Sequence, residues 1–85
     1  MEQLDKIIKG CRKQHRKSQE QLYLRFADLA MNVSYRYARD LPEAEDILQN
    51  AFIKVFANIQ RFNPQKGVFE AWLTRTVVNE ALQCH

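Results

Sequence analysis

The chain of 85 residues is poor in the residues that interrupt helices and cross-link chains. It contains two glycines, two prolines and two cysteines. So few turn-forming residues predict long helices with short connections. Cys11 and Cys84 lie near opposite ends of the sequence, a spacing that fits neither a zinc site nor a disulfide framework. We therefore expect a reduced, cytoplasmic setting.

Sequence signatures of catalysis and of membrane insertion are also absent. No apolar run approaches the roughly 18 residues that span a bilayer. There is no glycine-rich phosphate loop, no His-Glu-x-x-His motif and no EF-hand loop. The clustered acids Glu43, Glu45 and Asp46 fall in the first turn of an expected helix, where the helix dipole favours them. We expect no enzyme activity, no metal, no cofactor and no membrane contact.

The composition is that of a small globular domain. Hydrophobic residues make up 46% of the chain and charged residues 27%. The net charge of +3 is compatible with nucleic-acid binding but does not require it. Apolar residues at steps of three and four predict an all-α fold. We expect a compact bundle of three main helices, at about Ser18–Arg39, Leu41 to Arg61 or Phe62, and Val68–Leu82, plus a short N-terminal helix from Met1 to about Cys11.

The ends of these helices carry their own signals. Asp40 is the expected N-cap of the third helix, and Glu43 completes a capping box with it. Ser18 and Gln21 form a weaker box of the same type before the second helix. The basic run Arg12–Lys17 is interpreted as a solvated connector.

The third helix has two contrasting faces. One is a continuous apolar stripe that we assign to the core. The opposite face carries an acid, amides and an isolated isoleucine rather than the usual lysines and glutamates, namely Asp46, Gln49, Asn50, Ile53, Ala57 and Gln60. A polar surface with an apolar centre suits a partner helix. The alternative is an ordinary solvent face, because one exposed isoleucine is common.

The connection before the last helix, Asn63–Gly67, contains two turn signals, Asn-Pro and Lys-Gly. It is rich in side chains that can contact bases or phosphates: Arg61, Asn63, Gln65 and Lys66. The alternative is a polar surface turn without a binding role. Trp72 on the last helix is expected to anchor the core.

Two motifs in this order resemble region 2 of bacterial sigma factors. The first is A-E-D-I-L-Q-N-A-F at residues 44–52, and the second is F-x-x-W-L-x-R-x-x-x-N at residues 69–79. The segment L-Y-x-R-F at residues 22–26 resembles the start of the same region. The nearest group is the extracytoplasmic-function (ECF) sigma factors. The resemblance covers the chain from about Leu4 to Leu82.

The resemblance implies a helical domain that docks on the clamp helices of the RNA polymerase β′ subunit. Such a domain melts promoter DNA at the −10 element and holds the non-template strand. Asp46 and Gln49 match family positions that contact β′, and we add Asn50 and Ile53 because they share that face.

The resemblance also implies where DNA binds. Residues 61–67 match the family segment that captures a flipped −10 base, through Arg61, Asn63, Gln65 and Lys66. Arg75 and Asn79 match positions near the DNA path, whereas Trp72 matches a mostly structural position.

The chain departs from the family in one respect. A complete ECF sigma factor carries a second domain, region 4, which nothing here can form, so we expect a fragment that binds promoter DNA weakly on its own. An anti-sigma factor is a further partner that the resemblance implies. Two alternatives stay open: a helical protein-interaction module without a DNA function, and a duplex-binding helix-turn-helix domain, against which the last helix lacks a dense basic face.

Overall fold

The computed structural model describes residues 3–83, which contain four α-helices and two short 3-10 turns and no strand. The elements are α1 (Gln3–Arg12), α2 (Arg16–Tyr37), α3 (Leu41–Ala57), η1 (Ile59–Arg61), η2 (Pro64–Lys66) and α4 (Phe69–Gln83). The predicted all-α fold of three main helices and a short N-terminal helix is confirmed. Met1, where the first helix was expected to begin, lies outside the described residues.

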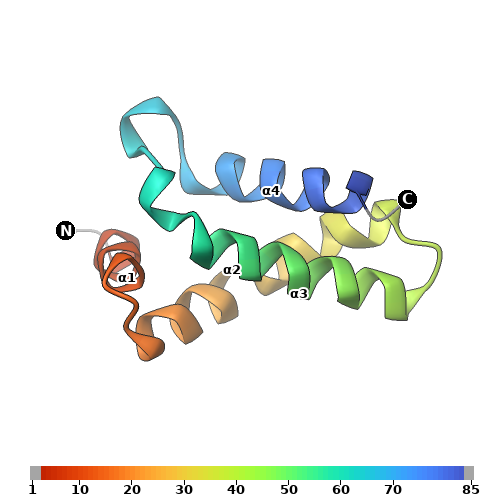
Figure 1. Ribbon diagram of the computed structural model, residues 1–85, viewed down its shortest axis with the longest axis horizontal. Helices are drawn as coiled ribbons and strands as arrows, with labels where there is room; N and C mark the ends of the chain where they lie inside the picture. Colours follow the sequence, from red (N-terminus) through yellow and green to blue (C-terminus); the bar gives the residue numbers. More distant parts are fainter. Residues whose placement is uncertain (1–2, 84–85) are drawn as a thin grey trace.

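The three long helices pack against one another along their lengths, and α1 lies across one end (Figure 1). In this view α1 is seen almost end-on, next to the connection that leads from α3 to α4. It packs against α2 and against η1. The α2–α3 turn lies at the opposite end of the molecule. The connection between α3 and α4 is therefore supported by the N-terminal helix.

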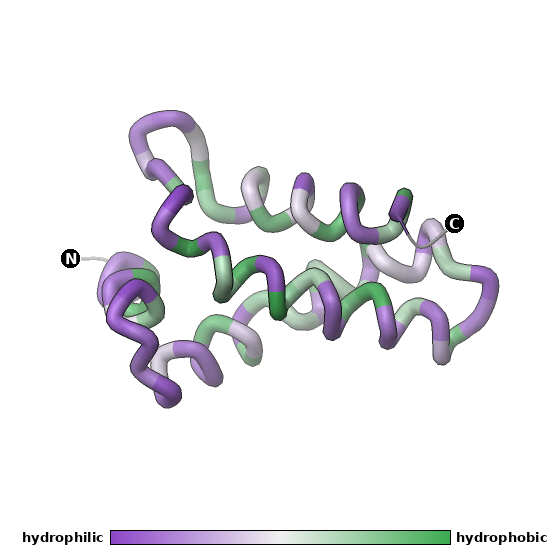
Figure 2. The backbone as a smooth tube through the Cα atoms, in the orientation of Figure 1, coloured by the Kyte–Doolittle hydropathy of each residue, from purple (hydrophilic) through white to green (hydrophobic). Residues whose placement is uncertain are grey.

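The core is formed by the apolar stripes of all four helices. Hydrophobic and hydrophilic residues alternate along every helix at helical spacing (Figure 2). The apolar faces predicted for α3 and α4 are buried, with Ile47, Val55, Leu73 and Val77 fully enclosed. Burying such side chains stabilises the fold by about 1.5–3 kcal/mol each. Tyr37 continues the helical spacing of the buried Leu22, Phe26 and Val33 in α2, but it is 39% exposed.

The buried Cys11 thiol belongs to this core. Burial raises its pKa to about 11. The thiol is therefore protonated near neutral pH and a poor nucleophile. It packs as a small apolar side chain.

The corner between α1 and α2 is tighter than the sequence suggested. A Cβ atom at Gly10 would lie 1.9 Å from Oγ of Ser18, so only glycine lets the two helices approach here. Gln14 adopts a φ of 62°, and the backbone N–H groups of Gln14 and His15 donate to the carbonyls of Cys11 and Gly10. This pattern closes α1 with a Schellman motif.

One expectation about this corner is wrong, and another holds only in part. Helix α2 begins at Arg16, so Ser18 lies inside the helix, where it packs on Gly10 instead of capping. The basic run is exposed from Lys13 to Lys17, as expected for a solvated connector, but not at its first residue. Arg12 belongs to α1, and its guanidinium donates to the carbonyl oxygen of Phe62.

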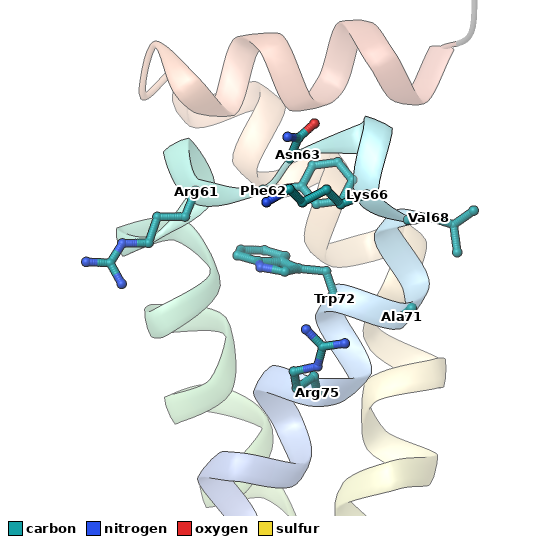
Figure 3. A pocket seen from close by; sticks show the side chains of 9 residues that line it. Arg61, Phe62, Asn63, Lys66, Val68, Ala71, Trp72 and Arg75 are labelled. Carbon is teal, nitrogen blue, oxygen red and sulfur yellow. The ribbon is translucent and has the colours of Figure 1, made fainter.

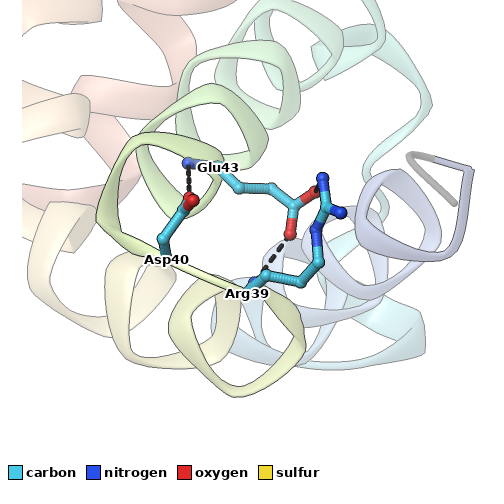
Figure 4. A network of polar contacts seen from close by, with 3 residues as sticks. All are labelled: Arg39, Asp40 and Glu43. Carbon is cyan, nitrogen blue, oxygen red and sulfur yellow. Dashed lines mark hydrogen bonds and ion pairs between the residues drawn. The ribbon is translucent and has the colours of Figure 1, made fainter.

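The predicted start of α3 is confirmed in part (Figure 4). The Asp40 carboxylate accepts a hydrogen bond from the backbone N–H of Glu43 at 2.9 Å, as expected for an N-cap. The Glu43 carboxylate, however, accepts from the N–H of Arg39, not Asp40, and pairs with the Arg39 guanidinium at 3.5 Å. The capping box is thus displaced by one residue.

Helix α3 also ends earlier than predicted, at Ala57 instead of Arg61 or Phe62. Asn58 leaves helical geometry, and its side-chain amide donates to the carbonyl of Lys54. The next residues tighten into η1, which turns the chain towards α4.

Candidate functional site

A pocket of about 240 Å³ lies at the connection between α3 and α4 (Figure 3). We call it the connection pocket. It is lined by Arg61, Phe62, Asn63, Lys66, Gly67, Val68, Ala71, Trp72 and Arg75. Figure 3 shows the Trp72 ring between Phe62 and the Arg75 guanidinium, with Asn63 and Lys66 on the connection above it and Arg61 to one side.

The backbone of the connection is shaped by Asn63 and Gly67. The Asn63 side-chain oxygen accepts a hydrogen bond from the N–H of Gln65 at 2.9 Å, which caps η2. Gly67 then adopts a φ of 154°, which residues other than glycine rarely adopt. The Asn63 oxygen already accepts this cap bond with one of its lone pairs, whereas its amide nitrogen donates to no group among the described residues. Asn63 therefore offers mainly an N–H donor to a ligand.

One wall of the connection pocket is aromatic. The Phe62 ring lies 5.3 Å from Phe69 and 5.5 Å from Trp72 between ring centroids, and Trp72 lies 5.7 Å from Phe69. Phe62 and Phe69 are buried, whereas Trp72 is half-buried and keeps part of its ring on the pocket. A partly exposed indole fixed by two other rings is a flat apolar surface on which a nucleobase can stack.

The rim of the pocket is positively charged. Arg61, Lys66 and Arg75 are all exposed and line it, and none of its described lining residues is acidic. The arrangement combines a stacking wall, an amide donor and three cations. These are the groups that bind an unpaired base together with its phosphates.

A second hollow of about 290 Å³ adjoins the connection pocket along α3 and α4, and we call it the side hollow. It shares Arg61, Trp72 and Arg75 with the connection pocket, and Asn79 is exposed on its lining. Lys54 also lines it.

The Lys54 ammonium is engaged by neighbouring side chains. It lies 2.6 Å from Oε1 of the buried Glu80, and it donates to Gln83 at 2.8 Å. It therefore adds less free positive charge to the side hollow than Arg61 or Arg75 does. The burial of Glu80 was not anticipated, and its pairing with Lys54 accounts for it.

The structure thus brings most of the predicted DNA-contacting residues to one place. Arg61, Asn63, Lys66 and Arg75 line the connection pocket, and Asn79 lines the side hollow. Gln65 is exposed on η2 but lines neither. Sequence reasoning missed Phe62, Val68 and Ala71 and placed Trp72 in the core alone. The aromatic pair three residues apart, at positions 69 and 72, was the available signal.

The second predicted surface lies between α2 and α3. Asp46, Gln49, Asn50 and Ile53 are all exposed on α3, and Ile53 is 65% exposed. Two hollows, of about 550 and 320 Å³, run beside them. We call these hollows together the α2–α3 groove. Gln49 lines both hollows, whereas Asn50 lines neither.

Helix α2 supplies the other side of the α2–α3 groove, which the sequence reasoning did not predict. Tyr23, Ala27 and Met31 line it, together with Phe52 and Phe56 of α3 among others. Tyr23, Ala27 and Met31 are spaced four residues apart, so they form a second stripe on α2 beside its buried stripe. That spacing was a readable signal. The acids Asp28, Glu45 and Asp46 line the hollow nearer the start of α3.

Comparison with known proteins identifies the family. Residues 22–84 match the family described as Sigma-70 region 2. The chain belongs to this family. The match begins within the first half of α2 and includes the connection pocket and the residues that line the α2–α3 groove, apart from Arg16, Gln19 and Glu20.

Named relatives agree with this membership. The chain is 37% identical over 62 residues to the ECF RNA polymerase sigma factor SigE of Mycolicibacterium smegmatis, covering 73% of this chain and 23% of the relative. It is 31% identical over 80 residues to the ECF RNA polymerase sigma factor SigW of Bacillus subtilis, covering 89% and 42%. It is 26% identical over 80 residues to the RNA polymerase sigma-H factor of Pseudomonas aeruginosa, covering 94% and 41%.

These matches confirm the predicted resemblance to region 2 of ECF sigma factors. The chain spans less than half the length of the curated relatives it matches. No solved structure gives a significant match.

Residues 3–83 lack two further features. No helix there combines the length and apolar character needed to cross a bilayer. No group of three or more His, Cys, Asp or Glu side chains in that range is arranged to hold a metal ion.

Proposed function

We propose that this domain directs transcription initiation by recognising and melting the −10 element of a promoter as part of an RNA polymerase holoenzyme. In this proposal the α2–α3 groove docks on the β′ clamp helices, and the connection pocket captures an unpaired base of the non-template strand. The domain acts by binding: it stabilises the unpaired state and so shifts the melting equilibrium.

One observation carries the DNA half of the proposal. The connection pocket combines the Trp72 ring, the Asn63 amide and three exposed cations at its rim. A flipped base needs a stacking surface and a polar group for its exposed edge. The neighbouring phosphates need positive charge, which supplies affinity without base selectivity. The side hollow continues the positive surface towards Asn79 and offers a path for the next nucleotide.

The docking half rests on the α2–α3 groove. One of its hollows is mainly apolar, with Tyr23, Phe52 and Ile53 among its lining residues, and the other is more polar and carries Asp28, Glu45 and Asp46. A hydrophobic centre surrounded by polar groups is the usual anatomy of a protein interface. No described residue lines both this groove and either of the two hollows at α4. The two binding functions can therefore be separated by mutation.

The alternative of a protein-interaction module would use the α2–α3 groove alone and leave the connection pocket without a role. Binding to short single-stranded DNA separates the two. We expect a mixed-sequence single strand to bind more tightly than an abasic strand of the same length and more tightly than the corresponding duplex. An abasic strand has the same phosphates but no base to stack.

The variant Asn63→Ser sharpens this experiment. A serine oxygen can still cap η2, whereas the amide nitrogen, the donor that the proposal assigns to the base, is lost. We expect base-dependent binding to fall about fivefold, as for the loss of one net hydrogen bond, with unchanged binding to the abasic strand. Equal affinity of the unmodified domain for the mixed-sequence and abasic strands would contradict the proposal and favour the interaction module.

A further inference from the structure

Helix α1 is tied to the connection pocket by a hydrogen bond from Arg12. Nη2 of Arg12 donates to the carbonyl oxygen of Phe62 at 2.6 Å, across 50 positions of sequence. Arg12 is half-buried, and its Nε is buried without a hydrogen-bond partner among the described residues. A guanidinium held in this way makes a short, charge-assisted bond that is stronger than a neutral one.

A second bond runs in the opposite direction. The side-chain amide of Gln60 donates to the backbone carbonyl of Arg12 at 2.7 Å. The two bonds reach the chain on either side of Arg61, one residue before it and one after it. Within residues 3–83 they are the side-chain hydrogen bonds that join α1 to the connection.

The hydrogen bond from Arg12 holds the peptide unit between Phe62 and Asn63, two residues that line the pocket. The Phe62 carbonyl and the Asn63 N–H belong to one planar peptide unit, so fixing that carbonyl also fixes the direction in which the chain enters Asn63. Phe62 supports the aromatic wall, and Asn63 carries the donor. Arg12 itself does not line the pocket.

We propose that Arg12 is a positioning residue for base capture: its guanidinium holds the peptide between Phe62 and Asn63 so that the stacking wall and the amide donor face the same base. The inference rests on the proposed function. It assigns α1, which lies outside the family match, a part in base selectivity.

The structure offers a matched pair of variants. Arg12→Met keeps a long unbranched side chain and removes the guanidinium. Lys13→Met removes one positive charge at the next residue, which is exposed and lies in the turn after α1. A third variant, Asp40→Ala, removes the N-cap of α3 at the far end of the molecule (Figure 1) and controls for a general loss of stability.

Two readouts are needed. Trp72 is the only tryptophan, so acrylamide quenching of its fluorescence reports on the pocket without any DNA. The ratio of affinities for a mixed-sequence single strand and an abasic strand of equal length reports base capture. The abasic strand also measures what the lost charge alone does, because the phosphate term is common to both strands.

We expect Arg12→Met to increase the quenching of Trp72 and to lower the affinity ratio about fivefold. Lys13→Met and Asp40→Ala should leave both readouts as in the unmodified domain. The inference is overturned if Arg12→Met behaves like Lys13→Met, or if Asp40→Ala lowers the ratio as much as Arg12→Met does.

The failure of the inference and the failure of the proposed function are distinguishable. If the unmodified domain itself does not separate the two strands, the proposed function fails. The part of Arg12 in base capture fails with it. Unchanged quenching of Trp72 in Arg12→Met would show in addition that Arg12 does not position the pocket.

Discussion

The α2–α3 groove and the connection pocket are built in different ways. The groove lies between two long helices, and the side chains that line it repeat at helical spacing. The pocket is assembled from two 3-10 turns, the irregular residues between and after them, and one face of α4, and Arg12 of α1 is hydrogen-bonded to its backbone. The groove therefore depends on local helix geometry, whereas the pocket depends on contacts between distant parts of the chain. Substitutions far from the pocket should therefore alter binding at the pocket more than substitutions far from the groove alter binding at the groove.

The largest effect is expected for Trp72→Ala. The substitution removes a half-buried ring that packs on Phe62 and Phe69, and we expect it to lower the free energy of unfolding by about 3 kcal/mol. It should also abolish the preference for a base-bearing strand over an abasic strand. Thermal unfolding and binding to a labelled oligonucleotide measure the two effects. Trp72→Phe, which keeps an aromatic wall, should retain much of the preference. Full preference in Trp72→Ala would exclude the ring from base stacking.

Gly10→Ala tests whether a distant corner reaches the pocket. The added methyl group would meet Ser18 at well under contact distance, so we expect a loss of about 2 kcal/mol and a shift of α1 away from α2. Because α1 carries Arg12, base-dependent binding should weaken while binding to the β′ clamp helices is retained. Urea unfolding and the two binding assays measure this. The second-site change Ser18→Gly makes room and should restore the pocket. If the double variant binds like Gly10→Ala, the contact is not the cause.

Ile53→Asp tests the groove alone. The side chain is 65% exposed, so the fold should be preserved, whereas binding to the β′ clamp helices should weaken about tenfold, or about 1.4 kcal/mol. Leu24→Asp introduces the same change at a 69% exposed position of α2 that does not line the groove. Circular dichroism and a titration of the isolated clamp-helix coiled coil are the measurements. Equal weakening by both variants would point to the added charge and not to the position of Ile53.

The smallest effect is expected for Gln14→Gly. Gln14 has a φ of 62°, which glycine adopts without strain, although glycine also gains freedom in the unfolded chain. We expect a net stabilisation of about 0.5 kcal/mol, seen as a higher midpoint of thermal unfolding. Neither binding function should change, because the Schellman geometry already holds the corner. A decrease in stability would show that Gln14 makes a favourable contact that outweighs its backbone strain.

The same contrast explains what could be predicted from the sequence. The exposed face with Gln49 and Ile53 was predictable because helical periodicity assigns each position to a side of α3. The buried stripes of α3 and α4 followed for the same reason. The role of Trp72 in the pocket was only partly predictable. The aromatic pair at positions 69 and 72 was a signal, but the place of the ring depends on how the connection after Phe62 leads into α4.

Long-range contacts account for the remaining errors. The hydrogen bond from Arg12 to Phe62 joins residues 50 positions apart, and no local sequence pattern predicts it. Ser18 looked like a cap because its sequence neighbours fit that role, but α2 begins at Arg16, and Ser18 lies against Gly10 of α1. The assignment of Asn63 and Arg61 to one DNA-binding segment was implied by the resemblance to sigma region 2. Only the fold indicates that the Asn63 oxygen is occupied by a cap.

The central claim is that the domain carries two separable binding surfaces. The most direct test measures Gln49→Ala and Asn63→Ser side by side, each against the isolated β′ clamp-helix coiled coil and against a base-bearing and an abasic single strand. We expect Gln49→Ala to weaken binding to the coiled coil alone, and Asn63→Ser to weaken base-dependent binding to DNA alone. Loss of both functions in either variant, with the helical content unchanged, would contradict the account.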